Sequence, residues 1–212
     1  MSFPTLLIAT TNRGKFREFS ELLDDLPLRL ASLADLPGAP AVAEDGATYA
    51  ANATHKALSL ARWSGCATLA DDSGLEVDAL RGAPGVHSAR YAGVEQDSRA
   101  NTHKLLQALE ASPPGERTAR FRCVLVVACP NGATLLAEGS CEGRILEAPR
   151  GGGGFGYDPV FFYPPLNSAF AEVPAAVKNR VSHRAVACVL LRRELMSFLL
   201  AHADACAGCK LG

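Results

Sequence analysis

Two long strand-like runs face each other across a tight turn signal in the second half of the chain, and this pattern constrains the fold most. The runs cover residues 119–129 and 134–145, and Pro130-Asn131-Gly132 lies between them. An Asn-Gly pair between such runs is a strong signal of a β-hairpin. The sequence therefore predicts an antiparallel component in the sheet.

The first half of the chain instead alternates strand and helix signals. Apolar residues recur at helical spacing after a polar turn at residues 10–15, and Gly65 is placed to end a second helix. The expected order is a strand at 6–9, a helix carrying Phe16 to Leu26, a strand near 28–33, a connection at 37–46, a helix from Thr48 to about Ser64, and a short buried strand at 67–70.

Two further helices are expected, at residues 97–111 and from about 182 to 203. Parallel βα units combined with a hairpin imply an α/β fold with a mixed β-sheet flanked by helices. The chain has 212 residues, shows no internal repeat and has no low-complexity linker. We therefore expect a single domain over residues 1–212, which is long enough to bury a substantial core.

Composition limits where in the cell the protein is expected and which partners it is expected to bind. The formal charge is −1, so general binding to a nucleic-acid polymer is not expected. No apolar run approaches the length needed to span a bilayer, and the start of the chain lacks the features of a signal peptide. These observations predict a cytoplasmic protein without a membrane partner.

Seven cysteines, an odd number, are scattered along the chain. In a chain of this length they do not suggest a disulfide framework, and most are expected to be reduced core thiols. Cys206 and Cys209 have the spacing of a metal or redox pair. They lack the second Cys or His pair that a closed zinc site needs.

The polar turn at residues 10–15 reads Thr10-Thr11-Asn12-Arg13-Gly14-Lys15. A turn between a strand and a helix N-terminus presents backbone N–H groups and the positive end of the helix dipole, and Lys15 adds a full charge. Phosphate binding is one interpretation. A capped turn with a surface lysine is the other, and no Walker A motif is present.

Carboxylates gather where the strand predicted at 67–70 ends. Asp71 and Asp72 follow it directly, and Glu44 lies just ahead of the preceding helix. Mg²⁺ typically takes one or two protein carboxylates together with waters and substrate phosphates, so these side chains are candidates for a hydrolytic metal site. Simple turn chemistry at Asp-Asp-Ser-Gly is the alternative.

Four glycines, residues 151–154, precede Phe155-Gly156-Tyr157-Asp158. Glycines permit positive φ angles and close approach to a ligand, while Phe155 and Tyr157 offer flat ring faces. Such a segment can cradle an anion and stack a planar ring. A flexible surface loop with an apolar anchor is the alternative.

A cationic set, Lys178, His183 and Arg184, lies near the last helix. Ser182 is the expected N-cap, which places two of these cations in the first helical turn, against the usual preference for acidic residues there. This placement favours an anionic ligand. A solvated basic surface is the alternative reading.

Taken together, these segments resemble the RdgB-type inosine triphosphate pyrophosphatases. Five motifs carry the likeness in order and in register: ATTNRGK at 9–15, ADDSGL at 70–75, GAPGVHSARY at 82–91, GFGYDP at 154–159 and SHR at 182–184. The resemblance implies an elongated mixed sheet with two lobes and a central cleft, as in Maf and ITPase proteins, and a homodimer. It also implies Mg²⁺-dependent hydrolysis of ITP, dITP and XTP to the monophosphate and pyrophosphate.

The resemblance also assigns residue roles by matching position. Asp72 would be the general base and a metal ligand, and Glu44 a further metal ligand. The expected substrate contacts are Thr10, Thr11, Asn12, Arg13, Gly14, Lys15 and Ser73 for the triphosphate, Phe155, Gly156, Tyr157 and Asp158 for the base and sugar, and Lys178, His183 and Arg184 for the purine.

One departure keeps other functions open. Residues 49–53 match a stretch where the family usually has Glu-Asn-Ala, and the Glu position is Ala51 here. Loss of a carboxylate beside the metal favours a nucleotide-binding regulatory module without turnover. A Maf-like pyrophosphatase acting on modified pyrimidine nucleotides is a second alternative, which the Ser182-His183-Arg184 match disfavours.

Overall fold

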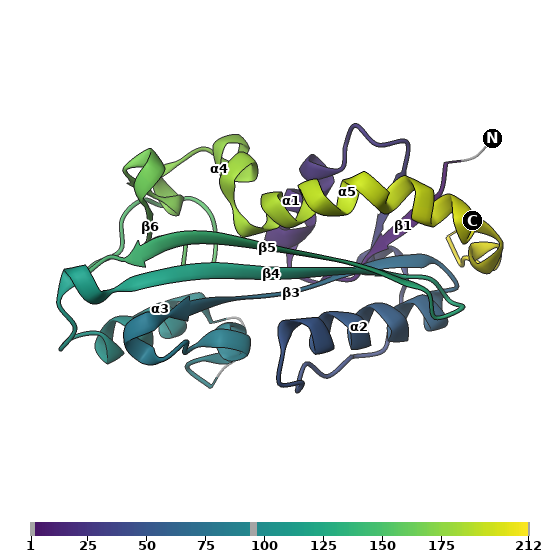
Figure 1. Cartoon of the computed structure of the whole chain (residues 1–212). Coiled ribbons are helices and arrows are strands. Elements are labelled where there is room, and N and C mark those ends of the chain that lie inside the picture. Colours follow the sequence, from purple (N-terminus) through teal and green to yellow (C-terminus); the bar gives the residue numbers. More distant parts are fainter. Residues whose placement is uncertain (1–2, 94–96, 212) are drawn as a thin grey trace. The chain divides into compact units, whose positions relative to one another are not determined.

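The computed structural model describes residues 3–93 and 97–211, and its centre is a seven-stranded sheet in the order β2-β1-β3-β4-β5-β6-β7 (Figure 1). β1 pairs in parallel with β2 and β3, whereas β6 pairs antiparallel with β5 and β7. The predicted mixed sheet is therefore confirmed. The strands are β1 (Thr5–Ile8), β2 (Arg29–Ser32), β3 (Ala67–Val77), β4 (Thr118–Ala128), β5 (Thr134–Ile145), β6 (Phe161–Tyr163) and β7 (Ser168–Ala169).

Five α-helices accompany the sheet among the described residues. They are α1 (Arg13–Leu22), α2 (Tyr49–Ser64), α3 (Ser98–Ala108), α4 (Ala175–Val181) and α5 (His183–Ala201). The seven-residue α4 was not predicted, because Pro174 and a single turn of apolar spacing give a weak helix signal. The described part of the chain contains no helix that is long and apolar enough to cross a membrane.

The chain divides into two compact units. The first comprises Met1–Asp72, Val124–Gly139 and Ala187–Gly212, and the second comprises Ser73–Cys123 and Ser140–Val186. Three strands, β3, β4 and β5, contribute residues to both units. The boundary on β3 falls at the peptide bond between Asp72 and Ser73.

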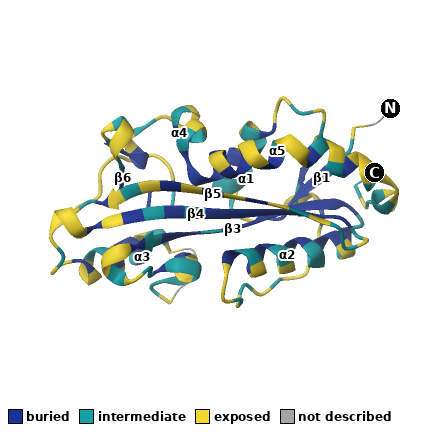
Figure 2. Ribbon diagram, viewed as in Figure 1, coloured by how far each residue is buried: buried dark blue, intermediate teal, exposed yellow. Residues whose placement is uncertain are grey.

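In the first unit, α1 and α2 cover opposite faces of the sheet (Figure 1). Helix α2 begins and ends as the sequence predicts: the Thr48 hydroxyl accepts from the N–H of Ala51, and Gly65 takes a left-handed φ of 71°. Residues at helical spacing, such as Ala53, Ala57 and Leu60, are buried (Figure 2). These residues form the buried face of the helix.

Strand β3 is longer than expected. It continues through Asp71, Asp72 and Ser73 to Val77, and its residues are almost continuously buried (Figure 2). The prediction of a strand that ends at Ala70 was wrong, because pairing inside a sheet overrides the turn preference of Asp, Ser and Gly. Both aspartates are consequently strand residues, with 2% and 6% of their surface exposed.

The hairpin between β4 and β5 is confirmed. The N–H of Cys129 donates to the carbonyl of Ala133 at 2.9 Å, and Gly132 in the turn has a positive φ of 94°. The second unit has an aromatic core, in which the ring centroids of Phe121 on β4 and Phe161 on β6 lie 4.5 Å apart. Phe170 packs against the same core at 5.0 Å from Phe161.

Cysteine chemistry differs in one respect from the prediction. Cys123, Cys129, Cys141 and Cys188 are buried, reduced cysteines, as expected. Cys66 and Cys209, however, form a disulfide across 143 residues. The pairing partner of Cys209 is thus not the nearby Cys206, and spacing alone did not reveal it.

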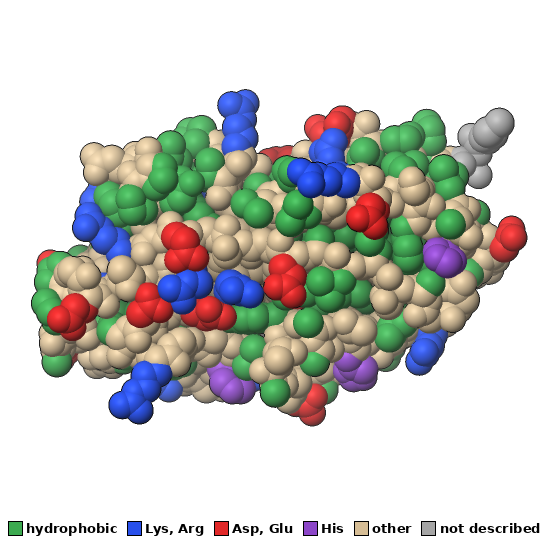
Figure 3. Space-filling model, in the orientation of Figure 1, with side chains coloured by type: hydrophobic (Ala, Val, Ile, Leu, Met, Phe, Trp, Pro, Cys, Tyr) green, Lys and Arg blue, Asp and Glu red, His purple; other side chains and the backbone are tan. Residues whose placement is uncertain are grey.

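The surface drawn in Figure 3 carries acidic and basic side chains interspersed, with no broad basic patch on that face. The second unit also contains an ionic network, in which Arg120 contacts Asp78 at 3.0 Å and Glu142 at 3.1 Å. Burial is slight there, and the contacts with Thr118 and Arg120 lower the pKa of Asp78.

Candidate active site

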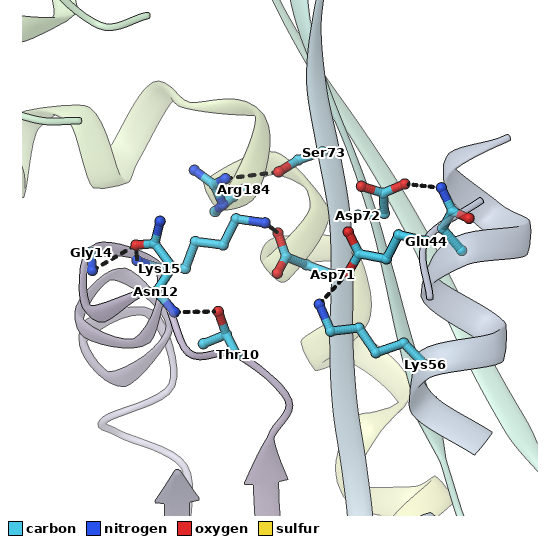
Figure 4. Close-up of polar contacts among 11 residues, drawn as sticks. Thr10, Asn12, Gly14, Lys15, Glu44, Lys56, Asp71, Asp72, Ser73 and Arg184 are labelled. Atoms are coloured by element: carbon cyan, nitrogen blue, oxygen red, sulfur yellow. Dashed lines mark hydrogen bonds and ion pairs between the residues drawn. The ribbon is translucent and has the colours of Figure 1, made fainter. Parts of the chain in front are cut away.

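The turn between β1 and α1, together with the first residues of α1, carries six of the predicted site residues: Thr10, Thr11, Asn12, Arg13, Gly14 and Lys15. Asn12 is the N-cap, and its Oδ1 accepts from the N–H groups of Gly14 and Lys15 at 2.9 and 3.1 Å. The Thr10 hydroxyl accepts from the N–H of Asn12 at 3.1 Å (Figure 4). The capped-turn reading is thus correct for these amides, and the turn is held in one conformation.

This turn opens onto a cavity in the first unit. The cavity has a volume of about 1010 Å³. Its walls come from Thr10 to Arg13, from the adjacent side of α1 and from the segment 32–41. Arg13 and Arg17 both line it. A polyanion is the kind of ligand that such a turn and two guanidinium groups attract.

Lys15 is not a surface lysine. Its ammonium lies 2.8 Å from Oδ2 of Asp71, whose side chain is 1% exposed (Figure 4). The two residues come from α1 and β3. The ion pair therefore connects the start of α1 to β3, the strand that also carries Asp72, the predicted catalytic residue.

Asp72 is held from the other face of β3. Nδ2 of Asn52 donates to Oδ2 of Asp72 at 2.8 Å, while Oδ1 of Asn52 accepts from the N–H of Gly46 (Figure 4). A Cβ at Gly46 would lie 2.6 Å from Oδ1 of Asn52, so any larger residue there would displace the amide that holds Asp72. Sequence reasoning missed Asn52, although it lies inside the matched stretch at 49–53.

Glu44 is bound by a second residue that the sequence did not single out. Nζ of Lys56 lies 2.5 Å from Oε1 of Glu44, and both side chains are largely buried (Figure 4). Lys56 is on the same helix as Asn52, one turn further along. A lysine at helical spacing from Asn52 was the available signal, but nothing in the sequence pairs it with Glu44.

The carboxylates of this unit influence one another. Burial raises the pKa of Asp72, and the charges of Glu44 and Asp71 raise it further against the opposing effects of Asn52 and Lys15. Burial also disfavours the charged form of Lys56. The attraction of Asp71, Glu44 and Asp72 outweighs that burial and raises the Lys56 pKa.

This donor set fits a hard divalent cation. Glu44 and Asp72 offer carboxylate oxygens whose mutual repulsion a cation would relieve. Among residues 3–93 and 97–211, no three His, Cys, Asp or Glu side chains are grouped closely enough to hold a metal by themselves. Mg²⁺ suits such a site, because it usually keeps several waters and substrate oxygens as ligands.

The second unit contains the remaining predicted residues, beginning with Ser73. Its hydroxyl accepts from Nη2 of Arg184 at 2.8 Å (Figure 4). The Arg184 guanidinium also lies 5.2 Å from the centroid of the Phe155 ring. Arg184 is 4% exposed, so its charge is held within the protein by these contacts.

The loop after the glycine run is built around Asp158. Its Oδ2 accepts from the N–H of Phe155 at 2.8 Å and from Nζ of Lys178 at 2.6 Å. Gly154 has a φ of 69°, and a Cβ there would collide with the Asp158 side chain. Lys178, on α4, is thereby held 4.6 Å from the centroid of the Phe155 ring.

Tyr157 does not offer an open ring face. It belongs to the core cluster of the second unit, is 5% exposed and donates its hydroxyl to the carbonyl of Ser88 at 2.9 Å. Burial raises its pKa. The expectation of two flat faces in this loop was wrong for Tyr157, because the ring completes the core. Gly156 precedes it with a φ of 63°.

His183 begins α5, with Ser182 as the cap that the sequence predicts. The Ser182 hydroxyl accepts from the N–H of Ala185 at 3.2 Å. The imidazole stacks on the Phe121 ring at 4.7 Å and 16°, and the residue is 2% exposed. Phe121 was not predicted as part of the site, because its contact with His183 joins a strand and a helix that lie far apart in the sequence.

Comparison with known proteins covers almost the whole chain. The family model described as the Ham1 family matches residues 6–194. A Desulforamulus reducens protein named dITP/XTP pyrophosphatase is 50% identical over 94% of this chain and 98% of its own. A protein of the same name from Geobacter sulfurreducens is 50% identical over 90% and 96%.

Solved structures agree with this match. A HAM1 protein from Coxiella burnetii superposes with a TM-score of 0.83 at 38% identity, covering 92% of this chain and all of that chain. The Staphylococcus aureus Ham1 protein gives a TM-score of 0.80 at 36% identity, with 92% and 99% covered.

Proposed function

The chain belongs to the Ham1 family, and on this basis we propose that it hydrolyses nonstandard purine nucleoside triphosphates. ITP, dITP and XTP would give the monophosphate and pyrophosphate. The observation that carries the proposal is a set of charged side chains around β3 in the first unit: the carboxylates of Glu44, Asp71 and Asp72 and the ammonium groups of Lys15 and Lys56. Phosphoryl transfer needs carboxylates that bind a metal ion next to basic side chains that bind the phosphates.

In this proposal, the first unit performs the chemistry. Glu44 and Asp72 would hold Mg²⁺, which supplies Lewis-acid stabilisation of the phosphate oxygens when bound. Residues 10–15 would contact the triphosphate. Lys15 and Lys56 would offset its negative charge, and Asp72 would orient a water toward the α-phosphorus, with Asn52 keeping that carboxylate in position.

The raised pKa of Asp72 supports its role as a base. A carboxylate whose proton affinity is higher than usual accepts a proton from water more readily at neutral pH. Because Asp72 would also contact the cation, it would accept a proton from water less readily the more tightly it binds the metal. Water activation through the metal is the competing route.

The second unit would read the purine. Lys178, His183 and Arg184 carry hydrogen-bond donors, and the C6 carbonyl of hypoxanthine and xanthine accepts hydrogen bonds where adenine presents an amino group. Phe155 would stack on the base, Ser73 would contact the triphosphate, and Gly156, Tyr157 and Asp158 would shape the loop. The ion pair between Lys178 and Asp158 supports a preformed loop.

We further propose that residues 1–212 act as one pyrophosphatase domain, that the protein is a cytoplasmic homodimer, and that it binds neither nucleic-acid polymers nor membranes. Its expected partners are purine nucleoside triphosphates and a second copy of itself. Sedimentation of the purified protein tests the dimer.

A substrate panel tests the function. Pyrophosphate release would be measured with ITP, dITP, XTP, ATP, GTP and modified pyrimidine triphosphates, with and without Mg²⁺. We expect turnover of the first three only, and only with the cation. Preference for the pyrimidines would support a Maf-like activity instead.

Ala51 favours one competing function, a nucleotide-binding module without turnover. Ala51 is exposed on the first turn of α2, beside Gly46, and brings no carboxylate. Tight binding of ITP without pyrophosphate release in the panel would support that alternative and overturn the enzyme.

A further inference from the structure

The C-terminal segment is fastened to the first unit at one junction. The Cys66–Cys209 disulfide joins it to the two-residue connection, Gly65 and Cys66, between α2 and β3. The N–H of Lys210 donates to the carbonyl of Ser64 at 3.0 Å, and Nη1 of Arg29 donates to the carbonyl of Leu211 at 2.6 Å. We call residues 206–211 the C-terminal latch.

The latch packs on the only tryptophan of the chain. Nζ of Lys210 lies 4.2 Å from the Trp63 ring centroid, and Trp63, Cys209 and Leu211 pack on one apolar cluster with Cys66. A Cβ on Gly65 would meet the Gly208 carbonyl at 2.4 Å, so the latch passes directly over the end of α2. Trp63 therefore reports whether the latch is docked.

A third cysteine, Cys206, lies on the latch itself and is a thiol. Cys206 is partly exposed and free, and the N–H of Cys209 donates to its carbonyl at 3.1 Å, so the two cysteines share one turn. On its other side Cys206 forms a hydrogen bond with Cys129. Burial, together with that hydrogen bond and the charge of Cys206, raises the pKa of Cys129 to about 12, which leaves Cys129 an inert thiol.

The latch itself lies outside the family match, which ends at residue 194, although Cys66 and Trp63 lie within it. The activity common to the family therefore does not explain the latch. A disulfide whose partner is the second cysteine of a Cys-x-x-Cys turn has an attacking thiol built in next to it.

We propose that Cys206 and Cys209 form a thiol–disulfide exchange site that releases the latch, with a dithiol reductant of the thioredoxin class as co-reactant. In the first step the Cys206 thiolate attacks Sγ of Cys209. A Cys206–Cys209 bond forms, the Cys66–Cys209 bond breaks, and Cys66 leaves with the electron pair and takes up a proton.

The second step is a reduction. The dithiol transfers two electrons and two protons to the Cys206–Cys209 disulfide, which becomes two thiols, and the reductant leaves as a disulfide. A disulfide oxidant such as glutathione disulfide reverses the sequence. Cys66 is fully buried, whereas Cys206 and Cys209 are both partly exposed, so the turn that carries these two cysteines is the accessible route to the disulfide.

Release of the latch would loosen the junction between α2 and β3. These two elements carry Asn52, Lys56 and Asp72, so release of the latch would change how firmly the proposed metal ligands are held. This link rests on the proposed function. In the docked state the junction is fixed by a covalent bond. In the released state it depends on packing alone.

The test uses the full-length protein in glutathione buffers of stepped ratio. Alkylation and peptide mass spectrometry identify the disulfide pairs, and Trp63 emission follows docking. We expect both Cys66–Cys209 and Cys206–Cys209 pairs in the wild type, and a shift of emission to longer wavelength on reduction. In Cys206→Ser only Cys66–Cys209 forms, and its reduction by a dithiol slows by about tenfold.

Cys188→Ala removes a buried thiol elsewhere in the first unit and is the matched control, with wild-type exchange expected. Absence of the Cys206–Cys209 pair at every ratio, or reduction of Cys206→Ser at the wild-type rate, would overturn the exchange site. Unchanged Trp63 emission after complete reduction would overturn the release.

The link to the site has its own readout. Reduction should raise the Mg²⁺ concentration needed for half-maximal pyrophosphate release in the wild type, and an unchanged requirement would refute that link. If the protein hydrolyses no nucleotide in either state, the proposed function fails, while the sulfur pairs and Trp63 emission still decide the exchange site.

Discussion

The two units balance their buried charges in different ways. In the first unit, carboxylates are bound by polar groups: Asp71 by Lys15, Glu44 by Lys56 and Asp72 by Asn52. The second unit also has a buried ion pair, Lys178–Asp158, but there the cations lie over aromatic rings as well. Lys178 and Arg184 both approach the Phe155 ring, and the His183 imidazole stacks on Phe121.

The difference indicates what each unit can bind. Oxygen ligands and ammonium groups suit a cation and phosphates, whose charges are hard and localised. Guanidinium, imidazole and phenyl planes suit a flat heterocycle that stacks and accepts hydrogen bonds at its edge. A nucleotide has one end of each kind, and substitutions in either unit should therefore fail in different ways.

The largest effect is expected from Asp72→Asn in the first unit. Asparagine keeps the shape but loses the charge that binds the cation and orients water, so pyrophosphate release should fall by about 10³-fold or more. Circular dichroism and the elution volume should stay at wild-type values. Near-normal pyrophosphate release would show that Asp72 is neither base nor metal ligand.

Lys178→Met should damage the fold of the second unit. The Lys178–Asp158 pair is almost fully buried, and removal of one partner from such a pair costs about 3 to 5 kcal/mol. Urea unfolding measures the loss. The double variant Lys178→Met with Asp158→Asn should regain much of that stability, and a double variant no more stable than the single one would contradict the pairing.

Arg184→Ala should change selectivity more than rate. Each unpaired polar contact costs about 1 to 3 kcal/mol, so kcat/KM for ITP should fall by roughly 10- to 100-fold while the value for ATP changes little. His183→Ala should act in the same direction. Equal losses for both substrates would assign these residues to phosphate binding or folding, and base reading to the loop around Phe155.

A smaller effect concerns stability and pH in metal-free buffer. Because the pKa of Asp72 is raised by burial, the fold favours its protonated form, and that contribution is lost as the pH rises from 3.8 through the raised value. Asp72→Asn should therefore melt at a higher temperature than the wild type at neutral pH. The two melting temperatures should converge in acid, and a constant difference would contradict the shift.

The smallest effect is expected from Ala51→Glu. Thr48 caps α2 and Ala51 is the third helical residue, so a glutamate there can complete a capping box worth less than about 1 kcal/mol. If the carboxylate also reaches the cation, the Mg²⁺ requirement should drop. Ala51→Gln, which can cap without a charge, is the control: equal effects of Glu and Gln would make the position structural.

Local signals predicted much of the fold. The Asn-Gly hairpin, the caps of α2 at Thr48 and Gly65, and the N-cap at Ser182 all depend on residues close in sequence. The end of β3 was predicted wrongly because sheet pairing, a non-local interaction, decided it. The turn at residues 10–15 and the carboxylates were singled out by residue type, and their roles in binding stay predictions.

The contacts of the site could not be read in the same way. Asn52 meets Asp72 across 20 residues, and the Cys66–Cys209 bond spans 143. Tyr157 has the composition of a stacking residue, yet its ring fills the core of the second unit. Such outcomes depend on which surfaces pack together, and a single sequence does not encode that in any local pattern.

The two aspartates of β3 are neighbours that serve different helices. Successive strand residues point to opposite faces, so Asp71 meets Lys15 of α1 and Asp72 meets Asn52 of α2. The arrangement depends on the alternation of faces along the strand. Deletion or insertion of one residue upstream in β3 would therefore exchange the two carboxylates between the helices. For this strand, the number of residues before Asp71 matters more than which apolar side chains they carry.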